Sequence, residues 1–135
     1  MDPETLVDKQ IEERRKLVEE LSAGGYEMGA AFWMRRNDDG EWRFYIVSPL
    51  VDSIGLQASY GRLREAKERG GKPFSGASSG VFLLGPSDPL GKDVLAIYAG
   101  PFGPREEVVY WNGIWLGKAS IDGAYFYPLP TAATV

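Results

Sequence analysis

The fold of this chain is decided by residues 26–52, which read YEMGAAFWMRRNDDGEWRFYIVSPLVD. This stretch predicts one long β-hairpin, with strands over Tyr26–Arg36 and Trp42–Val51 joined by a polar loop at residues 37–41. Gly40 is the loop residue that adopts a positive φ angle at least cost, as hairpin connections of this length require. We expect the rest of the chain to cover or extend this hairpin.

The register of the hairpin follows from the pair that closes its loop, which we expect to be Arg36 and Trp42. Because side chains alternate along a strand, the hairpin has two distinct faces. One face is apolar and is assigned to the core. Its expected cross-strand pairs are Met34 with Phe44, Phe32 with Ile46, and Ala30 with Ser48.

The other face is mixed and is the first candidate for a binding surface. Its expected pairs are Trp33 with Tyr45 and Arg35 with Arg43. An aromatic pair flanked by arginines is the kind of platform on which nucleic-acid binders stack bases. The structural alternative is a cross-strand aromatic pair, with arginine lying on the rings, that another element half-covers. The net charge of −4 favours that alternative, because nucleic-acid binding depends on phosphate neutralisation.

Length and composition predict one domain over residues 1–135. We divide it into an αββα half (1–72), a Gly/Ser-rich linker (73–80), a β-rich half (81–130) and a tail (131–135). No apolar run approaches the ~18–20 residues that cross a bilayer, and the charged N-terminal stretch is not a secretory signal. We therefore expect a cytoplasmic protein without a membrane partner.

The chain contains no His and no Cys. This composition excludes Ser-His-Asp and Cys-His catalysis, His- or Cys-ligated zinc and disulfides. Carboxylate, Lys, Tyr, Ser/Thr and Arg chemistry remains, and metals could be held by oxygen ligands alone. We expect a non-enzymatic protein with no catalytic residue, metal or cofactor.

Two helices are predicted in the first half. The first spans residues 3–23, with Asp2 as N-cap, and ends at Gly24-Gly25. The second spans residues 53–69 and is capped by Asp52 or Ser53. Gly55 within it should weaken it by roughly 1 kcal/mol relative to Ala.

The second helix carries a basic segment that permits three interpretations. Its cations are Arg62, Arg64, Lys67, Arg69 and, just beyond the helix, Lys72. They suit the negative end of a helix dipole, they could pair with the acidic first helix, or they could bind an anion or nucleic acid. The first two interpretations need no ligand, so we do not expect nucleic acid as the partner.

The second half is predicted to be mostly strand. Residues 76–80 match Gly-x-Ser-x-Gly, but a nucleophile elbow also needs a preceding strand and a histidine, so a linker is favoured. Residues 81–84 predict a short strand. Residues 94–99 favour a strand over a helical stretch after Asp88-Pro89, since the run is short and β-branched.

A tight hairpin is predicted at Asn112-Gly113, the strongest type I′ turn signal, between strands over 106–111 and 114–119. A last strand over 124–127 follows a turn at Asp122-Gly123. Tyr110 and Trp115 share one face of this hairpin and join the candidate binding residues, because Trp and Tyr supply much of the energy at interfaces.

Three strings, residues 31–34, residues 42–52 and Asp88-Pro89-Leu90, resemble small bacterial proteins without an assigned activity. The similarity runs over most of the chain, and its motifs are apolar strands and turns. It implies a bacterial cytosolic α+β domain and brings no activity, cofactor or partner.

These observations predict an α+β fold in which two helices pack on a largely antiparallel sheet, in the order αββα followed by four or five strands. The leading functional hypothesis is a binding or protein-interaction domain, whose partner is another protein or a second copy of itself. The alternatives are nucleic-acid binding and a carboxylate-based enzyme or ligand-binding protein. The candidate carboxylates are Asp38, Asp39, Glu41, Asp52, Asp88, Asp93 and Asp122.

Overall fold

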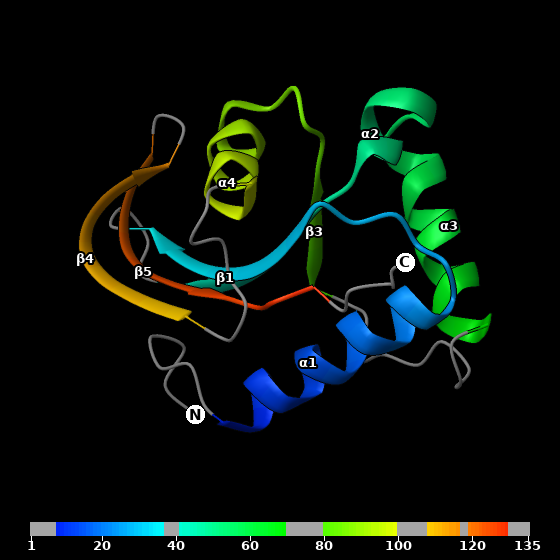
Figure 1. Ribbon diagram of the computed structural model, residues 1–135, viewed down its shortest axis with the longest axis horizontal. Coiled ribbons are helices and arrows are strands. Elements are labelled where there is room, and N and C mark those ends of the chain that lie inside the picture. Colours follow the sequence, from blue (N-terminus) through cyan, green and yellow to red (C-terminus); the bar gives the residue numbers. More distant parts are fainter. Residues whose placement is uncertain (1–7, 37–40, 70–79, 100–107, 117–118, 130–135) are drawn as a thin grey trace.

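The computed structural model of the chain describes residues 8–36, 41–69, 80–99, 108–116 and 119–129, with the backbone alone at 36, 108–116 and 119–122. Within these residues it contains four helices and five strands (Figure 1). In chain order they are α1 (Asp8–Ala23), β1 (Ala30–Arg36), β2 (Trp42–Val47), α2 (Pro49–Ile54), α3 (Leu56–Arg69), β3 (Val81–Leu84), α4 (Pro89–Ala99), β4 (Val108–Leu116) and β5 (Ala119–Phe126).

The described strands form a single sheet in the order β3-β2-β1-β5-β4. β2 and β3 run parallel, whereas the other three pairings are antiparallel. The predicted α+β class is therefore confirmed. The expectation of two helices in the order αββα followed by four or five strands is wrong, because the observed order is αββααβαββ. The central hairpin of β1 and β2 lies inside the sheet, and β3 and β5, which both come from the second half of the sequence, flank it.

Helices cover both faces of this sheet. α1 and α3 lie on one face and α4 lies on the other (Figure 1). The cluster on the first face joins Leu21 of α1 and Leu63 of α3 to Trp33 and Phe44 of the hairpin. The cluster on the α4 face joins Val94 to sheet residues that include Phe32 and Met34. Both faces of the hairpin are consequently core, and neither is an open platform.

The predicted register of the hairpin is wrong by one residue. Arg35 lies opposite Trp42, Trp33 opposite Phe44, and Phe32 opposite Tyr45. A shift of one residue moves every side chain of one strand to the other face relative to its partner strand. Because both faces are buried, apolar residues such as Phe32 and Trp33 follow one another directly, and alternation could not identify the register.

The end of α1 confirms the prediction at Gly24-Gly25. Gly25 has a φ of +84°, and its N–H donates to Ser22 O at 3.1 Å. The N–H of Tyr26 donates to Leu21 O at 2.9 Å, which completes a Schellman motif. Tyr26 and Leu21 also belong to the same buried cluster, so the motif leads the chain from the helix directly into the core.

The predicted second helix is in fact two helices. Ser48 caps α2, since its side chain accepts from Leu50 N at 3.2 Å, and Pro49 follows in the first turn. Gly55 separates α2 from α3 with a φ of +91°, a conformation that side chains disfavour. The prediction that Asp52 or Ser53 begins a single helix was wrong, because this glycine breaks the helix instead of weakening it.

The predicted strand at residues 94–99 is wrong, since these residues belong to helix α4. The Asp88 carboxylate accepts from Leu90 N at 2.9 Å, and Pro89 occupies the first helical position. Val94 is buried against the sheet. The helix-start signal was present in Asp88-Pro89, and the apolar run after it was misinterpreted because apolar content alone does not separate buried strands from buried helices.

The predicted turns at Asn112-Gly113 and Asp122-Gly123 are wrong as well. β4 continues through residues 112–113 and pairs antiparallel with β5 on both sides of them. The register shifts between Trp111 and Ile114, so two residues of β4 lie opposite one of β5, which is a β-bulge. Glycine is favourable in a bulge as well as in a turn, so the local sequence does not distinguish a bulge from a turn.

Some predictions fall outside the described residues: the helix start at Asp2, residues 73–79 of the linker with most of the Gly-x-Ser-x-Gly match, and the tail at 131–135. Among the helices that the structure describes, none combines the length and the hydropathy that crossing a membrane requires.

Candidate functional site

Trp33 and Tyr45, the centre of the predicted binding face, lie on opposite faces of the sheet. Trp33 packs in the cluster under α1 and α3, and Tyr45 packs in the cluster under α4. They are 5% and 7% exposed. The structure therefore does not bring them together as a surface, and their part in binding stays a prediction.

Tyr45 belongs to a row of aromatic rings in contact that crosses four strands. The ring centroids of Phe82 and Tyr45 are 5.5 Å apart, those of Tyr45 and Phe32 5.4 Å, and those of Phe32 and Phe126 5.6 Å. Phe82, at the β3 end of the row, is 43% exposed, whereas Phe32 and Phe126 are fully buried. The row therefore belongs mainly to the core, where contacts between its rings stabilise the packing of the four strands.

The two candidate arginines are separated in the same way. The guanidinium of Arg35 lies over the ring of Trp42, 5.5 Å from its centroid. Arg43 lies opposite Met34 and forms an ion pair of 3.1 Å with Glu41. The stacking of arginine on an aromatic ring, expected as the structural alternative, occurs at Trp42.

Tyr110 and Trp115, the last two predicted site residues, lie on β4. Their Cα atoms pair with those of Ala124 and Ser120 of β5. The structure describes only their backbone, so the prediction that their side chains contribute to an interface remains a prediction.

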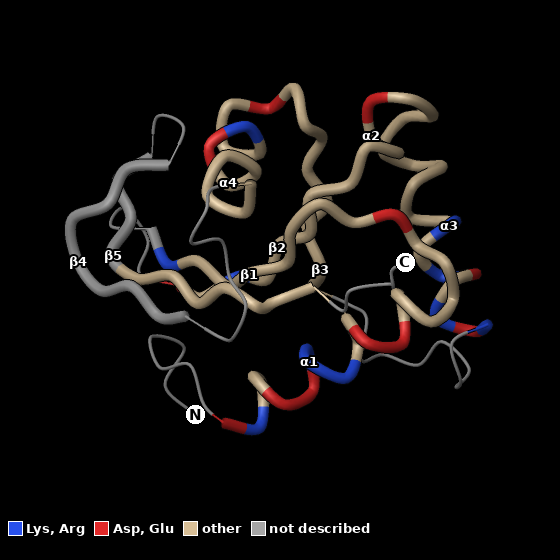
Figure 2. Tube along the Cα trace, in the orientation of Figure 1, with Lys and Arg blue, Asp and Glu red and all other residues tan. Residues whose placement is uncertain are grey.

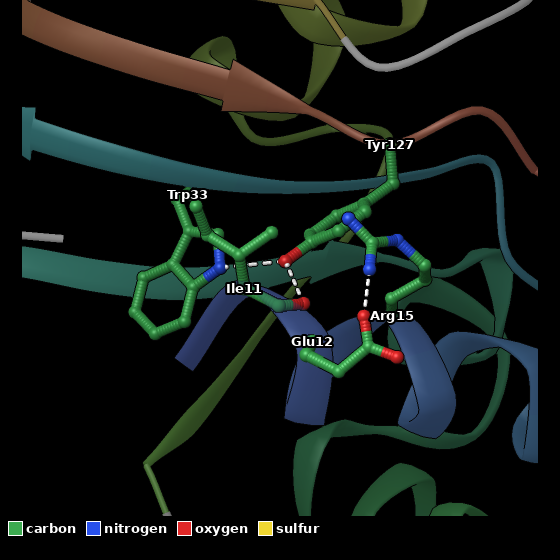
Figure 3. Close-up of polar contacts among 5 residues, drawn as sticks. All are labelled: Ile11, Glu12, Arg15, Trp33 and Tyr127. Carbon is green, nitrogen blue, oxygen red and sulfur yellow. Dashed lines mark hydrogen bonds and ion pairs between the residues drawn. The ribbon is translucent and has the colours of Figure 1, made fainter. Parts of the chain in front are cut away.

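A buried hydrogen-bond chain links α1 to the sheet (Figure 3). The indole Nε1 of Trp33 donates to the Tyr127 hydroxyl at 2.9 Å, and this hydroxyl donates to the Ile11 carbonyl at 2.8 Å. Tyr127 is only 1% exposed. On the solvent side of the same helix, Glu12 and Arg15 form an ion pair (Figure 3). The chain of polar contacts fixes the position of α1 against Trp33.

Replacing Tyr127 by phenylalanine is expected to lower the free energy of unfolding by about 2 kcal/mol, because the buried indole N–H of Trp33 loses its acceptor. Chemical denaturation monitored by fluorescence measures the change. Tyr125→Phe is the control, since that ring is only partly buried. An equal loss in both variants would show that the hydrogen-bond chain contributes nothing specific.

Tyr98 forms a second polar link, from α4 to the sheet. Its hydroxyl lies 2.6 Å from Tyr127 O and 2.8 Å from Ala31 O, and it donates its single proton to one of them. It also accepts from Ala31 N at 3.4 Å. Burial raises the pKa of Tyr98 well above its usual value, and the backbone hydrogen bonds offset part of this rise. The hydroxyl is therefore a neutral structural donor.

Stability is expected to fall above about pH 10, where tyrosines of the unfolded chain ionise. Because the pKa of Tyr98 is raised in the folded state, the unfolded chain loses this proton first as pH rises. The stabilisation by neutral Tyr98 is therefore complete below the pKa of the unfolded chain and is lost as pH rises above it. For Tyr98 the slope is about 1.4 kcal/mol per pH unit. Urea denaturation over this range should show a shallower decline for Tyr98→Phe, and identical slopes would contradict the assignment. Burial also raises the pKa of Tyr26. Because Tyr26 is present in both the wild type and Tyr98→Phe, it does not affect the comparison.

Three of the candidate carboxylates that the structure describes make local structural contacts. Asp52 accepts from Ser87 Oγ at 2.9 Å and from Ser87 N at 3.1 Å, which holds α2 against the turn before α4. Asp88 caps α4, and Glu41 pairs with Arg43. Among the described residues, no group of three or more Asp or Glu is arranged to hold a metal ion. Asp38 and Asp39 lie outside them, and only the backbone of Asp122 is described.

The basic end of α3 pairs with α1, as one of the three interpretations predicted. Lys67 is 4% exposed, and its Nζ lies 3.1 Å from the carboxylate of Glu20. Arg69 donates to Gly24 O at 3.1 Å. Acidic and basic residues are interspersed along both helices (Figure 2). Pairing between helices thus accounts for Lys67 and Arg69, whereas Arg62 and Arg64 are exposed.

Two open depressions adjoin one another at the end of the sheet where β1 begins. Their volumes are about 380 Å³ and about 450 Å³, and both are lined by Gly29 and Leu129. The first also has Glu27 and Met28 in its wall, and the second has Leu95 and Tyr98 of α4. Their walls are mainly apolar, and Glu27 is the carboxylate that lines them.

The two outer edges of the sheet differ in how they are closed. β3, at one edge, spans only residues 81–84. The hydroxyl of Tyr60 on α3 donates to Val81 O at 2.7 Å and accepts from Leu83 N at 3.2 Å. These are the backbone groups that another strand would need. Tyr60 therefore blocks strand addition at this edge.

β4, at the opposite edge, is longer and differs in composition. It spans nine residues, VVYWNGIWL, without a charged side chain. Within the described residues, β5 is its only strand neighbour. Proteins often protect edge strands by short length, charge, proline or a bulge, and of these four devices the nine residues of β4 have only the bulge. Figure 1 shows β4 as the outermost strand, far from β3.

Sequence reasoning missed this edge because the predicted turn at Asn112-Gly113 divided β4 into two strands. The available signal was the absence of charge from residues 108–116, which is unusual for a strand at an edge. No local signal identifies the contacts that the Tyr60 hydroxyl makes with β3.

Comparisons with protein-family models, with curated proteins and with solved structures each found no match for this chain. The resemblance to small bacterial proteins therefore stays an expectation.

Proposed function

We propose that this protein is a non-enzymatic protein-interaction domain, and that a strand of its partner pairs with the outer edge of β4. The observation that carries the proposal is the contrast between the edges: Tyr60 closes β3, whereas β4 has nine uncharged residues and a neighbour on one side only among the described strands. An extended peptide that joins such an edge gains backbone hydrogen bonds along its length.

The bulge in β4 supports one position for the partner strand. It interrupts the regular ladder between Trp111 and Ile114. The run Val108–Trp111 before it pairs regularly with residues 123–126 of β5. In an antiparallel strand, alternate residues direct both backbone groups away from their neighbour, so this run offers donors and acceptors to the outside. We place the partner strand along Val108–Trp111.

A peptide with the sequence of residues 108–116, flanked by lysines for solubility and labelled with a fluorophore, tests the proposal. Anisotropy should rise to saturation as the protein is added, and a peptide of the same composition in scrambled order should bind at least about tenfold more weakly, which is 1.4 kcal/mol. If neither peptide binds, or if both bind equally, β4 is not a site of strand addition.

A second candidate function, binding of a small apolar ligand, is supported by the adjoining depressions around Gly29 and Leu129. Apolar walls with few polar groups suit such ligands. The probe 8-anilinonaphthalene-1-sulfonate should gain fluorescence with the native protein and lose this gain in Leu129→Asp. Fluorescence that is unchanged by the substitution would place the probe elsewhere and remove this candidate.

A further inference from the structure

We infer that the strand which pairs with β4 is β4 of a second copy of this chain, so that two sheets join across a two-fold axis. This inference rests on the proposed function and names its partner. Three features of the molecule support a second copy over a foreign chain: the composition of β4, the closure that the dimer achieves, and the distribution of charge.

The composition of β4 is compatible with pairing against itself. An antiparallel pair about a two-fold axis places residues of Val108–Trp111 opposite residues of the same run in the other copy. Since β4 contains no Lys, Arg, Asp or Glu, no like charges oppose one another at any register. The run consists of two valines followed by Tyr110 and Trp111. Aromatic and β-branched residues are favourable cross-strand partners.

A two-fold dimer through β4 leaves no open sheet edge among the described strands, whereas head-to-tail pairing would build an open-ended row of copies. The sheet order is β3-β2-β1-β5-β4, so a dimer through β4 leaves a β3 strand at each outer edge. Both of these edges are closed by Tyr60. Head-to-tail pairing of β4 with β3 of another copy is blocked by the same hydroxyl. Association through β4 therefore stops at two copies, as isologous interfaces do.

The charge distribution also permits the approach of two copies. Each chain carries a net charge of −4. The charged residues of α1 and α3 are distributed along those helices (Figure 2), and β4 itself carries no charge. Because repulsion between charges that are separated by more than about 8–10 Å is screened at physiological salt, the net charge does not prevent pairing at this edge.

The experiment is sedimentation velocity of the full chain from low to high micromolar concentration. The wild type should pass reversibly from the 14.9 kDa monomer to a dimer of twice that mass. Val109→Lys, which puts a charge into the paired run, should weaken dimerisation at least about tenfold. Phe82→Lys is the matched control, because it puts the same charge on the closed edge at a residue that is already 43% exposed, and dimerisation should be unchanged.

A second measurement requires no substitution, so it remains decisive if Val109→Lys fails to fold. Excess unlabelled 108–116 peptide should dissociate the wild-type dimer. If the protein stays monomeric but binds the labelled peptide, a second copy is not the partner, and the proposed function still stands. A monomer that binds no peptide overturns both. A dimer that neither the peptide nor Val109→Lys affects overturns the assignment to β4.

Discussion

Phe44→Ala is expected to lower the free energy of unfolding by about 3–5 kcal/mol, the usual cost of removing a buried phenylalanine ring. The ring of Phe44 is fully buried between the sheet and α1. Its centroid lies 5.5 Å from that of Trp33 and 5.9 Å from that of Tyr127, and the guanidinium of Arg14 lies over its face at 5.4 Å. The substitution therefore opens a cavity where the hairpin, α1 and the end of β5 meet.

Phe82→Ala removes the same ring from the neighbouring strand and is the matched control. Because Phe82 is 43% exposed, its loss should cost below about 2 kcal/mol. Urea denaturation of both variants gives the comparison. Equal costs would mean that Phe44 does not lie between two packed layers, which would contradict the observed register.

Glu20→Gln is expected to lower the free energy of unfolding by about 3 kcal/mol, because it leaves the ammonium group of Lys67 buried without its carboxylate. The side chain of Lys67 is 5% exposed and that of Glu20 is 22% exposed, and the pair joins α1 to α3. The double variant Glu20→Leu with Lys67→Met should recover most of this loss, since apolar residues can replace a buried pair at little cost.

The control for this ion pair is Glu12→Gln, which removes an exposed pair with Arg15 on the same helix. Exposed pairs contribute up to about 1 kcal/mol, so the effect should be small. Thermal or chemical denaturation at low and high salt measures both variants. A double variant that is less stable than Glu20→Gln alone would contradict the view that an unpaired buried charge causes the loss.

The sequence was sufficient for the fold class and for elements with strong end signals. The end of α1 was predicted because two glycines leave few other conformations, and Gly25 indeed adopts a positive φ angle. The central hairpin was predicted because its strands are long and apolar. The pairing of basic α3 with acidic α1 followed from charge, although charge alone left the alternatives open.

The remaining errors share a physical cause, which is that tertiary contacts decide between local alternatives. The hairpin register depends on two helical layers that bury both Phe32 and Trp33. Asn112-Gly113 could form a turn or a bulge, and pairing with β5 selects the bulge. The contrast between the sheet edges depends on Tyr60 and β3, which lie 21 residues apart in sequence. The candidate site therefore could not be predicted before the strand order was known.

Amide hydrogen exchange of the full chain, with and without excess 108–116 peptide, tests most directly whether β4 accepts a strand while β3 does not. The account predicts that amides of Val108–Trp111 that point outward exchange rapidly in the dilute protein and become protected when the peptide is added. Amides of β3, closed by Tyr60, should exchange at the same rate in both samples. Rapid exchange in β4 that the peptide leaves unchanged would contradict the account.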